Sequence, residues 1–209
     1  MLFRSRSDFY WAAAEMYLMT RSEEDKAELL VRRGALQTYP MPVWRDISWL
    51  DTQGLGTLAL ANFAADQMLK QEALAALQGL ADAYLLEMDS QGYVIPFNRK
   101  EWQWGSVGVL ANRGMMLANV YDLTGDAQYR DGGYRLLEYI VGRNPRDVSY
   151  VSGMGEKSVT AVHHRCWAAS TSPDYPSPPP GAVSGGPKSS NPHGPVCRGI
   201  TPFWPAPTL

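Results

Sequence analysis

Residues 149–165 read Ser149-Tyr-Val-Ser-Gly-Met-Gly-Glu-Lys-Ser-Val-Thr-Ala-Val-His-His-Arg165, and this stretch decides how the rest of the chain is interpreted. It follows an amphipathic helical run that ends at Gly142-Arg-Asn-Pro145, and it joins a glycine-containing turn to two histidines and an arginine. Glycine allows tight backbone conformations close to a ligand. Histidine and arginine are donors suited to hydroxyl groups and to developing negative charge. The stretch therefore predicts a loop that carries a polar binding site.

The composition is that of an ordinary globular protein of one or two domains. The chain has 209 residues, which is enough for a sizeable core, and its formal net charge is −2. Because no basic block is present, nucleic acid is not an expected partner. No apolar run is long enough to span a membrane, so a membrane is not an expected partner either. The seven Trp and eleven Tyr are mostly expected in the core, with a minority available to stack on a ligand.

Apolar residues recur at helical spacing along most of the first 142 residues, with short polar turns between the runs and no strand alternation. Ser7 is a plausible N-cap of the first helix, and Asp51 or Thr52 of the third. Residues 34–42 break the pattern after the second helix, and Gly125 ends the fifth. This succession predicts an all-α fold of antiparallel helix pairs. The expected helices are 7–20, 22–32, one that carries the apolar residues of 55–63, 70–87, about 106–121 and 126–142.

The stretch at 149–165 closely resembles a signature of the family nine glycoside hydrolases, the inverting cellulase and endoglucanase family. That signature reads Ser/Thr/Val, any, apolar, Ser/Thr/Val, two any, Gly, any, Asn/Lys/Arg, four any, Pro or apolar, His, any, Arg. Eight constrained positions at fixed spacing are far more specific than a lone glycine-rich loop. The residues that match are Ser149, Val151, Ser152, Gly155, Lys157, Val162, His163 and Arg165.

The resemblance implies a fold and an activity. Family nine catalytic domains are (α/α)6 barrels of twelve helices, and this chain looks like roughly the second half of one, over residues 1–187. The implied reaction is hydrolysis of β-1,4-glucosidic bonds in cellulose or related β-glucans with inversion, and the implied partner is a β-glucan. Relatives are mostly secreted, which implies secretion of the parent protein, although residues 1–8 do not read as a signal peptide. No cofactor is expected, and the calcium of some relatives cannot be assigned to residues of this chain.

The resemblance also implies roles for particular side chains. His163 is the substrate-site histidine, which donates to a sugar hydroxyl at the scissile bond. Arg165 binds beside it and favours the charged form of nearby carboxylates. Trp104 lies in a segment, Trp102-Gln-Trp-Gly-Ser, that is similar to a family segment preceding a helix. Its ring either stacks on a glucose or packs at the barrel rim. Tyr150 is a further candidate substrate-binding residue on the signature segment.

An inverting glycosidase needs a carboxylic acid and a carboxylate about 6.5–9.5 Å apart. In this family the base aspartates lie in a segment like Asp-Ala-Gly-Asp-Tyr, and the acid glutamate lies in aromatic-x-Asp-x4-aromatic-x3-Glu. Neither motif is present in this sequence. We therefore expect the polypeptide alone to be inactive. A non-catalytic carbohydrate-binding module or a helical scaffold is the alternative. Helices without their barrel partners would expose apolar stripes, which predicts self-association.

The composition changes after Ser170, where Pro, Ser and Gly dominate. A Pro-Gly-x-x-x-Gly-Gly-Pro turn at 180–187 still resembles the family. We interpret residues 188–209 as an irregular tail, explained either by a frame shift near Asn191 or by a divergent, disordered end. A zinc site is a competing but weaker interpretation, because prolines oppose a helix in the tail and true zinc signatures pair two ligand units. Its ligands would be His163, His164, Cys166, His193 and Cys197.

Overall fold

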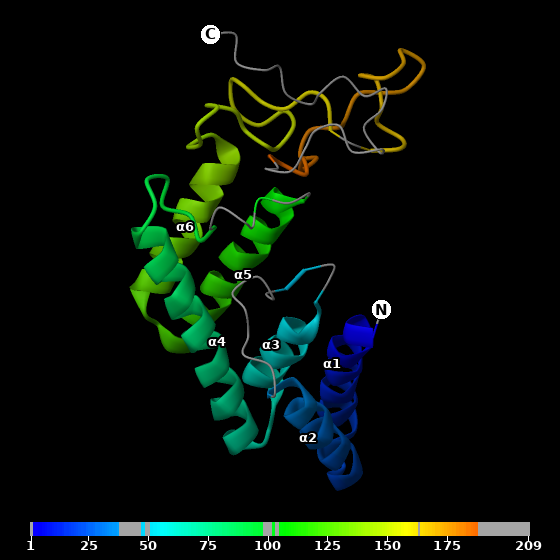
Figure 1. Ribbon diagram of the computed structural model, residues 1–209, viewed down its shortest axis with the longest axis vertical. Helices are drawn as coiled ribbons and strands as arrows, with labels where there is room; N and C mark the ends of the chain where they lie inside the picture. Colours follow the sequence, from blue (N-terminus) through cyan, green and yellow to red (C-terminus); the bar gives the residue numbers. More distant parts are fainter. Residues whose placement is uncertain are drawn as a thin grey trace. The chain divides into compact units, whose positions relative to one another are not determined.

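The computed structural model describes residues 2–37, 47–48, 51–97, 102, 105–162 and 164–187. Within these residues the chain forms six α-helices and a few isolated β-bridges but no strand, so the predicted all-α class is confirmed. None of these helices is long and apolar enough to cross a lipid bilayer. They follow one another along the chain (Figure 1) as α1 (Leu2–Thr20), α2 (Glu23–Gln37), α3 (Gln53–Phe63), α4 (Gln67–Asp89), α5 (Ser106–Thr124) and α6 (Ala127–Val141).

The first two helices are longer than the sequence pattern predicted. Helix α1 begins at Leu2, so Ser7 is a buried residue inside the helix and not its N-cap. A serine can cap a helix, but it does not by itself end one. Helix α2 continues through Gly34 to Gln37, because a single glycine weakens a helix by only about 1 kcal/mol relative to alanine. The rest of the predicted break, from residue 38 to 42, lies outside the described residues.

Side chains at the helix starts explain where α2 and α3 begin. The Ser22 hydroxyl accepts a hydrogen bond from the Asp25 backbone N–H at 3.1 Å, and it donates to the Asp25 carboxylate at 2.8 Å. The Ser22 hydroxyl thus accepts from an N–H of the first turn, as an N-cap side chain does. At α3 the N-cap position is Thr52, but the Asp51 carboxylate accepts from the Gln53 N–H at 3.1 Å. The Thr52 hydroxyl instead donates to Asp8 of α1 at 2.6 Å.

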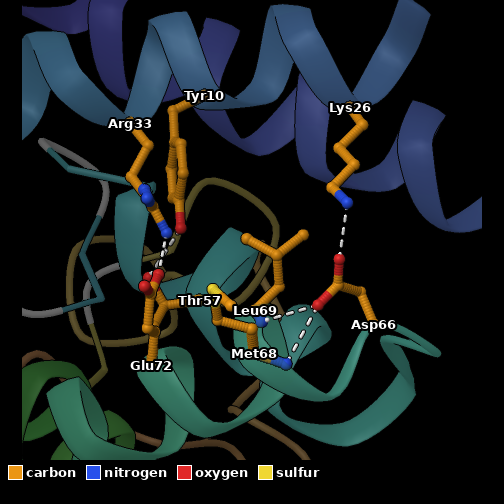
Figure 2. Close-up of polar contacts among 8 residues, drawn as sticks. All are labelled: Tyr10, Lys26, Arg33, Thr57, Asp66, Met68, Leu69 and Glu72. Carbon is orange, nitrogen blue, oxygen red and sulfur yellow. Dashed lines mark hydrogen bonds and ion pairs between the residues drawn. The ribbon is translucent and has the colours of Figure 1, made fainter. Parts of the chain in front are cut away.

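The described chain divides into two compact units, and the first of them consists of residues 1–96 and 109–136. In this unit α1 packs against α2 and α3, and α3 packs against α4. Figure 2 shows the polar contacts that join these helices: Tyr10 with Thr57, Arg33 with Glu72, and Lys26 with Asp66 at 2.6 Å. The apolar core beneath them includes Ala14, Tyr17, Leu29, Leu60, Leu77, Ala81 and Tyr84.

Asp66 has two functions at the start of α4. Its carboxylate accepts hydrogen bonds from the backbone N–H groups of Met68 and Leu69 at 2.9 and 3.1 Å, which makes it the N-cap (Figure 2). It also pairs with Lys26 of α2. The hydrogen bond from Lys26, followed by the one from Leu69, lowers the pKa of the Asp66 carboxyl. The same residue therefore starts one helix and holds another beside it.

The second unit consists of residues 97–108 and 137–209. It contains the first residues of α5, the last turn of α6 and the loops that follow α6, which Figure 1 draws in yellow and orange. The whole signature segment belongs to this unit. Helix α6 ends at Val141 and is followed by Gly142, close to the predicted end.

Candidate functional site

The turn that leads from α6 into the signature segment is held by the buried amide of Asn144. Its Nδ2 donates to the backbone carbonyls of Tyr139 and Val148, each at 2.8 Å, and its Oδ1 accepts from the Arg146 N–H at 3.1 Å. An asparagine that bonds the backbone two residues on is a recognised turn former. No role was predicted for Asn144 from the sequence, although an Asn-Pro pair directly after a helix is a turn signal that could have revealed it.

The signature segment folds back on itself at Ser149. The Ser149 N–H donates to the Lys157 carbonyl at 2.8 Å, and its carbonyl accepts from the Val159 N–H at 3.0 Å. The next residue, Tyr150, donates its N–H to the carbonyl of Ile140 in α6, also at 2.8 Å. Gly155, in the turn between these two arms, has a φ of +79°, a conformation that glycine adopts without strain. The constrained serine and glycine of the signature therefore shape the backbone.

Ser152 joins the signature segment to the later Pro/Gly-rich segment. Its N–H donates to the Ala182 carbonyl at 2.9 Å, and its carbonyl accepts from the Gly181 N–H at 2.7 Å. The Ser152 hydroxyl donates to the carbonyl of Pro179 and accepts from the Ala182 N–H. Nearly every polar atom of this buried serine is thus bonded to residues 179–182. Ser152 is consequently a structural residue of the loop cluster.

The end of the same Pro/Gly-rich segment reaches the start of α5. The Ser184 N–H donates to the Tyr150 carbonyl at 2.8 Å, and the Gly185 carbonyl accepts from the Val107 N–H at 3.3 Å. The Ser106 hydroxyl donates to the Pro187 carbonyl at 2.7 Å. Residues 180–187 therefore connect the signature segment to the residues that follow Trp104. This role of Ser106 was not predicted from the sequence, where the position of Ser106 at a helix start was the available signal.

An aromatic cluster lies beneath these loops. The rings of Phe97 and Trp102 stack with centroids 5.0 Å apart, and Trp102 lies 6.2 Å from Tyr139. Tyr139 in turn lies 6.2 Å from Tyr150. Stacked and tilted aromatic pairs of this kind add stability beyond the area they bury. The cluster holds residue 102, the end of α6 and the signature segment together in one core.

The structure separates the residues assigned from sequence into different environments. Tyr150 is only 2% exposed, and burial raises the pKa of its hydroxyl. Its ring therefore belongs to the core and supports the segment from beneath. Arg165 is exposed, as is Lys157, which pairs with Asp147 at 2.5 Å. His163 and Trp104 lie outside the described residues.

Three of the eight constrained positions of the signature are buried. Ser149, Ser152 and Val162 are 1%, 3% and 5% exposed. Buried side chains cannot contact a polymer in solution, so these positions are structural. Of the charged signature side chains in the described residues, Arg165 has no carboxylate partner there, whereas Lys157 has one. Arg165 is thus an exposed cation of this segment that no described carboxylate neutralises.

The described residues bring no pair of carboxylates together at this site. Glu156 and Asp174 are exposed loop residues, while Glu87 and Asp89 belong to the end of α4 in the other unit. Nor does any group of three or more His, Cys, Asp or Glu in this described part of the chain lie close enough to hold a metal ion. Three ligands of the zinc interpretation, His163, His193 and Cys197, lie outside it. What the site offers chemically is hydrogen-bond donation from a shaped loop.

The sequence profile of Glycosyl hydrolase family 9 matches residues 4–196 of the chain. This chain belongs to glycosyl hydrolase family 9. The match includes α2 to α6, all but the first two residues of α1 and the loops of the site, and it runs past Asn191. The predicted boundary between residues 187 and 188 stays a prediction.

Known members of the family cover most of the chain. It is 34% identical over 203 residues to a cellulose 1,4-beta-cellobiosidase from Acetivibrio thermocellus, and this match covers 87% of the chain but 22% of that protein. The solved structure of a Bacteroides ovatus GH9 protein has 31% identity and a TM-score of 0.73, over 88% of the chain and 33% of that protein. AaCel9A, solved with cellobiose-like isofagomine, has 26% identity and a TM-score of 0.72, over 92% and 35%. The six helices are accordingly part of the family's (α/α)6 barrel, and the chain spans about a third or less of each relative.

Proposed function

We propose that the chain supplies one wall of the substrate site of a hydrolase that cleaves β-1,4-glucosidic bonds in cellulose or a related β-glucan by inversion. In this proposal His163 and Arg165 donate to sugar hydroxyls at the bond to be cleaved, and Trp104 stacks on a sugar ring. Tyr150 supports the signature segment without touching the sugar. One observation supports the proposal most directly. Residues 180–187 form hydrogen bonds both to the signature segment and to Ser106, which is two residues after Trp104.

The reaction of an inverting glycosidase supports these roles of the side chains. Inverting hydrolysis needs a carboxylic acid at the leaving oxygen and a carboxylate that activates water. Residues around that pair bind the sugar and hold its distorted ring through hydrogen bonds to hydroxyls. A relative named as a cellulose 1,4-beta-cellobiosidase and another solved in complex with cellobiose-like isofagomine support a β-glucan ligand. Because the sequence has neither carboxylate motif, we propose that the 209-residue polypeptide binds the glucan and does not hydrolyse it.

Binding of cellohexaose to the 209-residue chain, measured by isothermal titration calorimetry, tests the proposal. Arg165→Ala and His163→Ala should each weaken the affinity by about tenfold or more, because each removes a hydrogen bond from a charged or strongly polar donor. Lys157→Ala is the matched control, since it removes an exposed cation of the same segment that already pairs with Asp147. Equal losses in Lys157→Ala and Arg165→Ala would indicate nonspecific attraction and contradict the site.

A hydrolysis assay of the chain tests its inactivity, and the same assay on a longer protein distinguishes the proposal from its alternative. Incubation of cellohexaose with the chain should release no new reducing ends, whereas measurable release would contradict our proposal that the chain is inactive alone. The alternative is a non-catalytic carbohydrate-binding or helical scaffold role, which the absence of paired carboxylates among the described loops favours. In a longer protein that contains both this chain and the two carboxylate segments, the α-anomer should be the first product seen by proton NMR. Only the hydrolase gives that result.

A further inference from the structure

His164 makes two contacts that fix its ring. The backbone N–H of Cys166 donates to Nδ1 of His164 at 3.1 Å. The imidazole also stacks on the indole of Trp167, with ring centroids 4.0 Å apart and an angle of 19° between the planes. His164 is exposed and Trp167 is half-buried, so the indole covers one face of the imidazole.

The hydrogen bond defines which nitrogen of His164 can act. Nδ1 accepts, so the proton of the neutral ring is on Nε2. A side-chain acceptor that bonds the backbone N–H two residues later closes a small turn, as Asn and Asp do in Asx turns. The residue enclosed in this turn is Arg165. The backbone from which the Arg165 side chain departs is therefore held by the ring of its neighbour.

Two anchors flank the turn. Val162, on one side, is buried. On the other side, Trp167 is followed by a tight turn in which the Ala168 carbonyl accepts from the N–H groups of Thr171 and Ser172 at 2.8 and 3.2 Å. Between these anchors, among the described residues, the backbone is restrained by the hydrogen bond from the Cys166 N–H to Nδ1 of His164. A long side chain such as arginine loses less freedom on binding when its backbone is already fixed.

We infer that His164 is a positioning residue, which orients Arg165 for glucan binding through the turn that its Nδ1 closes. This inference rests on the proposed function, because it requires Arg165 to bind the sugar. It gives a role to a position that the family signature leaves free. In this role His164 acts on the backbone, through the bond that its Nδ1 accepts from the Cys166 N–H.

Three substitutions separate the turn from the stack. His164→Ala removes both the acceptor and the stacked ring. His164→Asn restores an acceptor that suits the turn but removes the stack, and His164→Phe keeps a stacking ring but removes the acceptor. With cellohexaose as the probe, His164→Ala and His164→Phe should weaken affinity about fivefold, the equivalent of one ordinary hydrogen bond. His164→Asn should stay within about twofold of the wild type.

Amide hydrogen exchange at Cys166, followed by NMR, reports the turn without any ligand. Exchange should be faster in His164→Ala and His164→Phe, and close to the wild-type rate in His164→Asn. If exchange accelerates but cellohexaose affinity is unchanged, the positioning role is wrong while the binding site stands. If His164→Asn loses as much affinity as His164→Ala, the turn is not the cause and the inference is again wrong. If wild-type chain and Arg165→Ala bind equally, the proposed function itself fails, and the inference with it.

Discussion

The hydroxyl of Ser106, at the start of α5, donates a hydrogen bond of 2.7 Å to the carbonyl oxygen of Pro187, 81 residues later in the chain. Ser106 is buried, and the neighbouring Val107 N–H bonds the Gly185 carbonyl. This pair of contacts closes the loop cluster of the candidate site. Family membership alone would not have revealed which contact closes it.

Ser106→Ala should destabilise the chain by about 1–3 kcal/mol, because it leaves the Pro187 carbonyl without its donor. Urea unfolding followed by circular dichroism measures the change. Ser90→Ala is a suitable control, since Ser90 also donates to a backbone carbonyl, that of Glu87 at 2.7 Å, but is exposed. Its effect should be within about 0.5 kcal/mol. Equal losses of unfolding free energy in the two variants would show that the Ser106 hydrogen bond stabilises the chain no more than an exposed one.

Gly186→Ala should be more disruptive than Gly181→Ala. Both glycines have positive φ, +80° and +89°, so alanine costs about 1–2 kcal/mol at either position. A methyl group at Gly186 would also collide with the Val107 side chain, whereas the space beside Gly181 is open. Overpacking of this kind adds about 1–3 kcal/mol.

The double substitution Gly186→Ala with Val107→Ala provides the check on that explanation. Val107→Ala removes the colliding methyl groups, so the two changes should be clearly non-additive in unfolding experiments. Additive losses would mean that backbone conformation alone accounts for the need for glycine at 186.

Asp66 should make stability depend on pH in the acid range. The Lys26 pair and the Leu69 N–H hold its pKa below the ordinary value of 3.8. A lowered folded pKa means that the stabilisation is present above the unfolded pKa and is lost as pH falls through the folded pKa. Asp66→Asn keeps a capping oxygen but not the charge, so its melting temperature should fall less than that of the wild type on acidification. Parallel curves for the two proteins would contradict this assignment.

The exposed apolar side chains of α1 should cause the isolated chain to self-associate. Phe9, Met16 and Met19 are 54%, 50% and 80% exposed. Sedimentation velocity at increasing concentration should reveal association, and Met16→Glu with Met19→Glu should reduce it. Met154→Glu, at an exposed methionine of the other unit, is the control and should have little effect. A clean monomer with a reversible two-state melt would show that this prediction is wrong.

Helix positions were predicted well where the signal is local. Gly125 ends α5 with a φ of +74° and a bond from its N–H to the Tyr121 carbonyl, as its identity predicted. The predictions from Ser7 and Gly34 were wrong, since each residue type is common at helix ends but tolerated inside a helix. The start of α4 at Gln67, three residues before the predicted one, depends on the Asp66 cap, which the apolar periodicity does not record.

By itself the amino-acid sequence determined the helical class and the family, because apolar periodicity and the spacing of the signature are properties of neighbouring residues. The tertiary structure decided which signature residues are structural and which face solvent. Tyr150 illustrates the difference: from sequence it was a candidate ligand contact, and in the structure its ring packs against Tyr139. Burial of a side chain depends on segments far apart in the chain, such as Ser106 and Pro187. No local pattern encodes that pairing, so only the folded chain could reveal it.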